Sequence, residues 1–81
     1  MTNLDVTLPD LGEETVEAVV LAIWHAKVGD EIAEGADLAE VTTDKAAFTL
    51  PAPATGRLIK RLANEGDEIA VGSVICVLET P

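Results

Sequence analysis

The chain has 81 residues, 48% of them hydrophobic and 25% charged, which predicts one small packed domain and excludes a disordered segment. Fifteen acidic residues against five basic ones give a net charge of −10, which argues against nucleic acid and anionic membranes as partners and favours a partner with a basic face. A single cysteine excludes an internal disulfide, no apolar run approaches the roughly 18 residues of a membrane span, and the N-terminus lacks a secretory signal, so we expect a cytoplasmic protein.

The first half of the chain predicts short β-strands separated by turns. Residues Leu4–Leu8 alternate apolar and polar, which is typical of a strand, and Pro9 begins a loop with two adjacent carboxylates, Glu13 and Glu14. The run Val16–Trp24 is rich in β-branched residues and has no helix cap, which favours a strand over a helix. The elements expected next are a turn at 29–30, a strand at 31–33, a turn at 35 and a strand at 38–43.

Residues 41–50 predict a hairpin with a lysine at its tip. Two β-prone runs flank the pair Asp44-Lys45, which is a permitted turn, although Asn-Gly or Asp-Gly would be a stronger signal. The segment Pro51-Ala52-Pro53 then predicts extended chain that cannot lie in a central strand, and residues 57–62 predict another strand. Only Lys27 and Lys45 are basic among the first 56 residues, so a lone lysine at this tip needs an explanation.

An internal repeat decides the expected fold. The seven residues Gly29–Gly35 recur as Gly66–Gly72 with six identities, at an offset of 37. The repeat predicts an all-β fold, a flattened barrel or sandwich of two small antiparallel sheets related by a pseudo-two-fold axis. Asp30 and Asp67 are expected to accept hydrogen bonds from backbone amides in equivalent turns. Because the offset sends Asp44 beyond the repeat to the C-terminus, we expect both termini at the end opposite Lys45.

Five short motifs follow one another along the chain: Leu8–Glu13, Trp24 with Val28–Asp30, Thr43–Ala46, Pro51–Gly56 and Glu65–Asp67. With these motifs in this order, the chain resembles the lipoyl domains of the dihydrolipoyl acyltransferase component of 2-oxo-acid dehydrogenase complexes, in the biotinyl/lipoyl-attachment family. The resemblance covers essentially all of residues 1–81 and implies a single lipoyl domain with the barrel-sandwich hybrid fold. One departure is Thr42, where the family often has glutamate, which could alter partner preference.

The resemblance implies that lipoic acid is joined by an amide to Lys45, with Asp44 and Ala46 as flanking recognition residues. It implies a swinging-arm acyl carrier that a thiamine-dependent 2-oxo-acid decarboxylase acylates reductively and that delivers the acyl group to an acyltransferase active site. The other implied partners are a lipoate-attaching enzyme and dihydrolipoyl dehydrogenase. Such a domain is not itself an enzyme and belongs to a dihydrolipoyllysine-residue acyltransferase. The family places the first loop beside the lysine turn, which makes Glu13 and Glu14 candidates for recognition by the decarboxylase.

Two alternatives remain open. A biotin carrier domain shares this fold, although the resemblance would then call for methionines on both sides of the lysine, where this chain has Asp44 and Ala46. An unmodified β-sandwich interaction module predicts no modification at all. In each case we expect no bound metal, and we expect the isolated domain to be a monomer.

The other reactive or aromatic residues are interpreted as structural. Cys76 lies in an apolar strand and is expected to be buried and inert, and Trp24 is expected to fill the core. His25 has no second ligand or nucleophile in view, so we expect a structural or surface role. Three basic residues that follow the hairpin are interpreted as members of local ion pairs: Arg57, Lys60 and Arg61.

Overall fold

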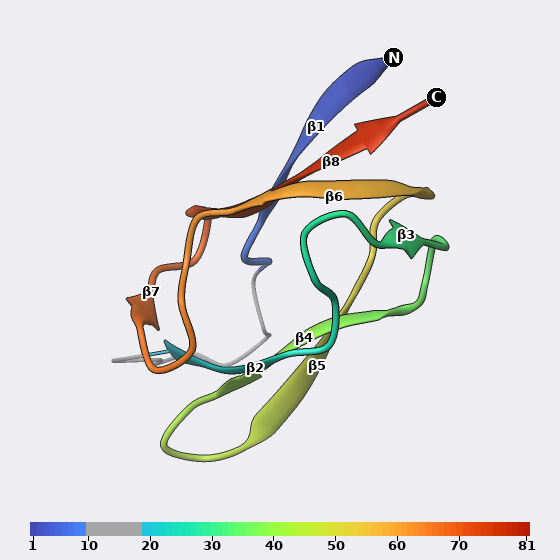
Figure 1. Cartoon of the computed structure of the whole chain (residues 1–81). Coiled ribbons are helices and arrows are strands. Elements are labelled where there is room, and N and C mark those ends of the chain that lie inside the picture. Colours follow the sequence, from blue (N-terminus) through green and yellow to red (C-terminus); the bar gives the residue numbers. More distant parts are fainter. Residues whose placement is uncertain (10–18) are drawn as a thin grey trace.

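The computed structural model describes residues 1–9 and 19–81, and every regular element in them is a β-strand (Figure 1). The strands are β1 (Thr2–Thr7), β2 (Val19–Trp24), β3 (Glu31–Ile32), β4 (Asp37–Thr42), β5 (Ala47–Pro51), β6 (Gly56–Arg61), β7 (Glu68–Ile69) and β8 (Val74–Thr80). A search of these residues for a helix long and apolar enough to cross a membrane finds none.

The strands form two four-stranded antiparallel sheets that face one another (Figure 1). One sheet has the order β1-β8-β6-β3 and the other the order β5-β4-β2-β7. The predicted fold class is confirmed, with the qualification that the two sheets do not close into a barrel. Pro51 ends β5, which is an edge strand, as its missing N–H requires.

The predicted pseudo-two-fold symmetry is present in the strands and in their hydrogen bonds. An offset of 37 carries β2, β3 and β4 onto β6, β7 and β8, and carries one sheet order onto the other. The Gly29 amide donates to the Leu58 carbonyl at 2.7 Å, and the Gly66 amide donates to the Leu21 carbonyl at 2.7 Å. The two glycines have φ values of +99° and +94°, a region that side-chain-bearing residues resist. The prediction that they occupy corresponding turns is therefore confirmed.

The aspartates of the repeat hold these turns. The Lys27 amide donates to Oδ2 of Asp30 at 3.0 Å, and the Asn64 amide donates to Oδ2 of Asp67 at 2.9 Å. Each aspartate thus accepts a backbone hydrogen bond from three residues upstream, as the sequence predicts.

The core lies between the sheets and is built from aliphatic side chains of both halves. Leu21, Leu58, Leu38 and Ile75, two pairs that the offset relates, are all fully buried. Trp24 is half-buried and packs against this core, as predicted, and its indole N–H donates to the Ala63 carbonyl at 3.0 Å. The other core residues are Val6, Leu8, Val19, Ala26, Ile32, Ala39, Val41, Leu50, Ala52, Ala63, Cys76 and Leu78.

The hairpin tip and the termini lie at opposite ends of the molecule, as the repeat predicts (Figure 1). Thr2 pairs with Thr80 at the start of the β1–β8 ladder, so the two termini lie side by side. The longest dimension is 37 Å against 20 and 18 Å for the other two. The tip of the β4–β5 hairpin is therefore remote from both termini.

Candidate functional site

The candidate site is the turn that joins β4 to β5. The ladder between these strands pairs Val41 with Phe48 and Thr42 with Ala47, and the Thr43 amide then donates to the Ala46 carbonyl at 2.8 Å. Asp44 and Lys45 are left as the two central residues, which agrees with the predicted tip. β4 ends at Thr42, one residue before the predicted end of that strand, because Thr43 already belongs to the turn.

The Thr43 side chain organises this turn. Its hydroxyl oxygen accepts the amide N–H of Lys45 at 3.2 Å and that of Ala46 at 3.1 Å. The same hydroxyl donates to the Ala46 carbonyl at 3.3 Å. No described residue other than glycine has a positive φ, so this is not the type I′ turn that Asn-Gly or Asp-Gly would form. The hydroxyl closes a turn that otherwise has a weak sequence signal.

Lys45 presents a primary amine at an exposed and anchored position. Asp44, Lys45 and Ala46 are exposed, whereas Val41 and Leu50 in the flanking strands are buried in the core. Across residues 1–9 and 19–81, the one ion pair joins Arg57 to Glu31, so no carboxylate of this part lies within 4.0 Å of the Lys45 ammonium. An unpaired amine on a hydrogen-bonded turn fits a group that is attached through an amide, because acylation needs access to that nitrogen.

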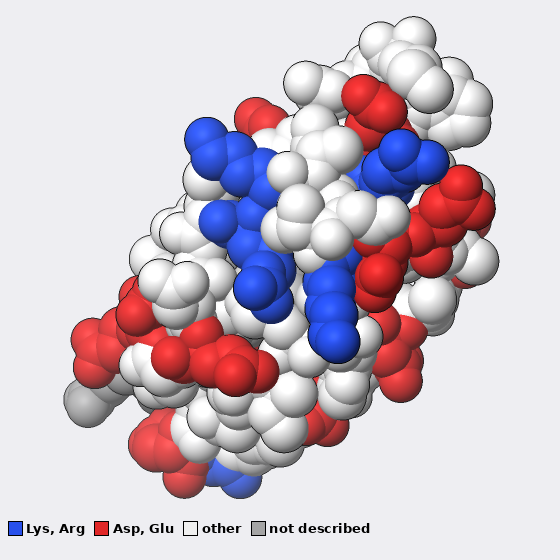
Figure 2. All heavy atoms as spheres, in the orientation of Figure 1, with Lys and Arg blue, Asp and Glu red and all other residues white. Residues whose placement is uncertain are grey.

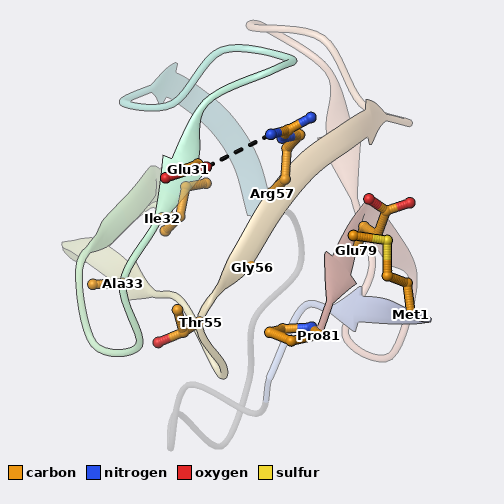
Figure 3. Close-up of a pocket in the computed structure, with 9 residues that line it drawn as sticks. All are labelled: Met1, Glu31, Ile32, Ala33, Thr55, Gly56, Arg57, Glu79 and Pro81. Carbon is orange, nitrogen blue, oxygen red and sulfur yellow. Dashed lines mark ion pairs between the residues drawn. The ribbon is translucent and has the colours of Figure 1, made fainter.

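The hollow in Figure 3 lies elsewhere on the molecule. It has a volume of about 490 Å³ and lies where the chain ends meet β3 and β6. The Arg57 guanidinium and the Glu31 carboxylate face each other there at 3.6 Å, both largely exposed. Its lining residues are Met1, Glu31, Ile32, Ala33, Thr55, Gly56, Arg57, Glu79 and Pro81. This hollow is therefore not part of a site around Lys45.

The remaining predicted site residues have different outcomes. Asp44 and Ala46 lie beside Lys45 in the turn, and their role in recognition stays a prediction. Glu13 and Glu14 lie outside the described residues, so their role in partner recognition stays a prediction. Sequence reasoning missed the role of Thr43, although a threonine at the first position of a turn is a recognisable signal for this kind of hydrogen bond.

Comparison with known proteins connects this geometry to a family. Residues 4–78 match the biotin/lipoyl family, which is described as "Biotin-requiring enzyme". The chain is 42% identical over 74 residues to the lipoamide acyltransferase component of the branched-chain alpha-keto acid dehydrogenase complex of Pseudomonas aeruginosa. That alignment covers 91% of this chain and 17% of that protein. The chain is 35% identical over 80 residues to the dihydrolipoyllysine-residue succinyltransferase component of the 2-oxoglutarate dehydrogenase complex of Cupriavidus necator, covering 99% of this chain and 19% of that protein.

A solved structure agrees with these relatives. The solution structure of the lipoyl domain of the 2-oxoglutarate dehydrogenase complex from Azotobacter vinelandii superposes with a TM-score of 0.75 at 26% identity, and the match covers 95% of this chain and 96% of that one. The chain thus belongs to the biotin/lipoyl family, and its similarity is to a lipoyl domain and to acyltransferase components of 2-oxo-acid dehydrogenase complexes. It spans less than a fifth of the length of the two acyltransferase components.

Proposed function

We propose that this chain is a lipoyl carrier domain and that lipoic acid is joined through an amide to Nζ of Lys45. The observation that carries the proposal is the position of Lys45, an exposed amine at the tip of a hydrogen-bonded hairpin, with no ion-pair partner among the described residues. The similarity to lipoamide acyltransferase components and to a lipoyl domain supports lipoic acid as the attached group.

The domain presents the attached group, and that group, when bound, supplies the acyl-transfer and redox chemistry. Thr43 fixes the backbone of the turn, and the buried residues of β4 and β5 fix the turn to the core. The lysine side chain and the lipoyl chain together span roughly ten bonds, or about 14 Å. That reach lets the end of the arm enter a partner's active-site channel while the protein remains outside.

Attachment also changes the charge of the tip. An amide on Lys45 removes its positive charge, so the net charge of the chain moves from −10 to −11. Asp44 is then the one charged residue of the 43–46 turn. A partner that loads or unloads the arm therefore meets a neutral arm beside a carboxylate, which favours a cationic rim around its channel.

The partners follow from the proposed carrier role. We propose a lipoate-attaching enzyme that modifies Lys45, a thiamine-dependent 2-oxo-acid decarboxylase that loads the arm, an acyltransferase catalytic domain that unloads it, and a dihydrolipoyl dehydrogenase that reoxidises it. The names of the relatives support a place in a dehydrogenase complex of this kind.

Biotin is the competing attached group because the family covers both cofactors. The urea carboxylase of Kluyveromyces lactis shares the fold at a TM-score of 0.62, but at 21% identity it indicates the fold alone. The residues beside Lys45 favour lipoic acid, because Asp44 and Ala46 stand where a biotin carrier would be expected to have methionines.

Intact-mass spectrometry of the protein expressed with a lipoate-attaching enzyme, with and without lipoate, tests the proposal. We expect the mass of one lipoyl group on the wild type and none on Lys45→Arg, which keeps the charge but removes the acylatable amine. Lys27→Arg is the matched control, and its Lys45 should be fully lipoylated. A lipoyl mass on Lys45→Arg, or a biotinyl mass on the wild type, would overturn the assignment.

A further inference from the structure

The basic residues of this acidic chain are segregated. Figure 2 shows them gathered on the face that β6 crosses, away from the β4–β5 tip. β6 supplies three of them, and Lys27 lies beside Arg61, with which it lines a hollow of about 420 Å³. We call this surface the basic face, and its residues are Lys27, Arg57, Lys60 and Arg61. It holds four of the five basic residues of a chain whose net charge is −10.

Among the described residues, ion pairing accounts for Arg57 alone in the basic face, so the interpretation made from the sequence holds for Arg57 and is corrected for Lys60 and Arg61. Arg57 pairs with Glu31 at 3.6 Å, and both side chains are largely exposed. Within the part of the chain that the structure describes, Lys60 and Arg61 have no carboxylate within 4.0 Å. The guanidinium of Arg61 instead lies 5.7 Å from the centre of the Trp24 ring. That contact orients Arg61 and leaves its N–H groups available.

The fold does not require these charges either. The other half of the molecule builds the same strand and the same turn with uncharged residues at every equivalent position. The offset of 37 relates the basic face to Val20, Asn64, Ile23 and Trp24. Because the backbone of the two halves is the same at these positions, the four cations are an addition to the scaffold.

The surroundings of the basic face narrow the kind of partner. Leu62 follows Arg61 and is 47% exposed, and Val28 follows Lys27 and is 55% exposed, so apolar side chains alternate with the cations. Glu31, Glu65 and Glu79 border the face, and a long polyanion would meet them. A segment short enough to contact only Lys60 and Arg61 would avoid Glu31, because Arg57, the ion-pair partner of Glu31, is four residues from Arg61 on the strand, about 13 Å.

We propose that the basic face is a docking surface for a short acidic polypeptide segment that carries an apolar side chain among its carboxylates. The carboxylates would meet the free Lys60 and Arg61 groups, and the apolar side chain would cover Leu62 or Val28. Docking there leaves the hairpin tip uncovered, so the domain can be held by a partner while Lys45 stays accessible. The proposal does not depend on which group Lys45 carries.

Amide chemical-shift mapping of the 81-residue chain tests the docking surface. The probe is the blocked peptide acetyl-Glu-Glu-Leu-Asp-Glu-amide, and the control probe is acetyl-Gln-Gln-Leu-Asn-Gln-amide. We expect saturable shifts in β6 and around Lys27 with the acidic peptide at 20 mM salt, a loss of at least tenfold in affinity at 300 mM salt, and no saturable binding of the neutral peptide.

Charge-removing variants complete the test. Lys60→Gln combined with Arg61→Gln should weaken acidic-peptide binding at least tenfold, and Lys60→Gln alone, which keeps the contact between Arg61 and Trp24, at least threefold. Lys45→Gln removes a cation at the far end of the molecule and should change binding less than twofold. Equal binding by the double variant, or shifts centred on the tip, would overturn the proposal. Tighter binding to a ten-base-pair DNA duplex or to phosphatidylglycerol vesicles than to the peptide would overturn the choice of partner.

Discussion

The side chain that shapes the candidate site is Thr43, two residues before the lysine. Its hydroxyl accepts two backbone N–H groups of the turn and donates to one carbonyl, which fixes the direction in which Lys45 leaves the hairpin. Both acceptor contacts exceed 3.0 Å and are exposed, so each contributes about 1 kcal/mol or less to the turn. That is enough to orient the turn and too little to determine the fold.

Thr43→Val keeps the shape of the side chain and removes the hydroxyl. We expect the rate of lipoate attachment to fall about fivefold, which corresponds to about 1 kcal/mol of lost turn order. Amide hydrogen exchange at Lys45 and Ala46 should accelerate, while the free energy of unfolding changes by less than about 1 kcal/mol. Thr43→Ser restores the hydroxyl and should recover both the attachment rate and the protection. Unchanged exchange at these two amides in Thr43→Val would contradict this role.

Cys76 is the other residue with a chemical consequence. It is fully buried in β8, and burial raises the pKa of its thiol from 9.0 to about 11. The folded protein therefore holds a thiol and not a thiolate at neutral pH, which confirms the predicted burial. The proposed lipoyl disulfide at the tip thus meets no competing thiolate among the described residues.

The pKa of Cys76 predicts a pH dependence of stability. Because the folded pKa is above the unfolded one, the stabilisation is complete below about pH 9 and is lost as the pH rises toward about 11. The free energy of unfolding of the wild type should fall by about 2 kcal/mol more than that of Cys76→Val across this range. Urea unfolding at several pH values measures the difference. Parallel pH profiles for the two proteins would show that the thiol is not shielded.

At the scale of elements, the two halves of the domain use the same turn twice. Gly29 and Gly66 have positive φ, and nothing lies within 4 Å of the position where a Cβ would stand. Glycine is favoured at both positions because the backbone has a positive φ, and not because a side chain would lack space. Gly56 is a contrasting case, because a Cβ there would lie 2.6 Å from the Glu79 carbonyl oxygen, where β6 meets β8.

The symmetry predicts equal costs for equivalent substitutions. Gly29→Ala and Gly66→Ala should each lower the free energy of unfolding by about 1–2 kcal/mol, because each forces an L-residue into the left-handed region. Chemical denaturation measures both values, with Ala33→Gly as a loop control that should change stability by less than about 1 kcal/mol. Costs that differ by more than about 1 kcal/mol would mean that the two turns are not energetically equivalent.

At the scale of the whole molecule, the repeat was the most informative part of the sequence. An offset of 37 is enough to predict the paired turns, the two sheets and the separation of Lys45 from the termini. The same offset relates Trp24 to Arg61, but their contact, 5.7 Å from the guanidinium to the ring centre, does not follow from the offset alone. The resemblance of the motifs added the attached group, which symmetry alone could not supply.

Other features could not be read from the sequence. Local composition suggests that Arg57, Lys60 and Arg61 pair with nearby acids. The positions of their charged groups depend on the three-dimensional course of β6, which composition does not give. In the described residues, Arg57 alone forms an ion pair. The exact strand ends also could not be predicted from the sequence. Thr43 is β-prone, but its hydroxyl bonds within the turn, so β4 ends one residue earlier than the sequence indicates.

We propose that Lys45 is the attachment point and that the rest of the domain presents it. Peptide mapping by tandem mass spectrometry, on protein expressed with a lipoate-attaching enzyme and lipoate, locates the modification directly. We expect a lipoyl amide on the peptide that contains Lys45, and unmodified Lys27 and Lys60. A lipoyl group on either of those lysines, or an unmodified Lys45 in fully folded protein, would contradict it.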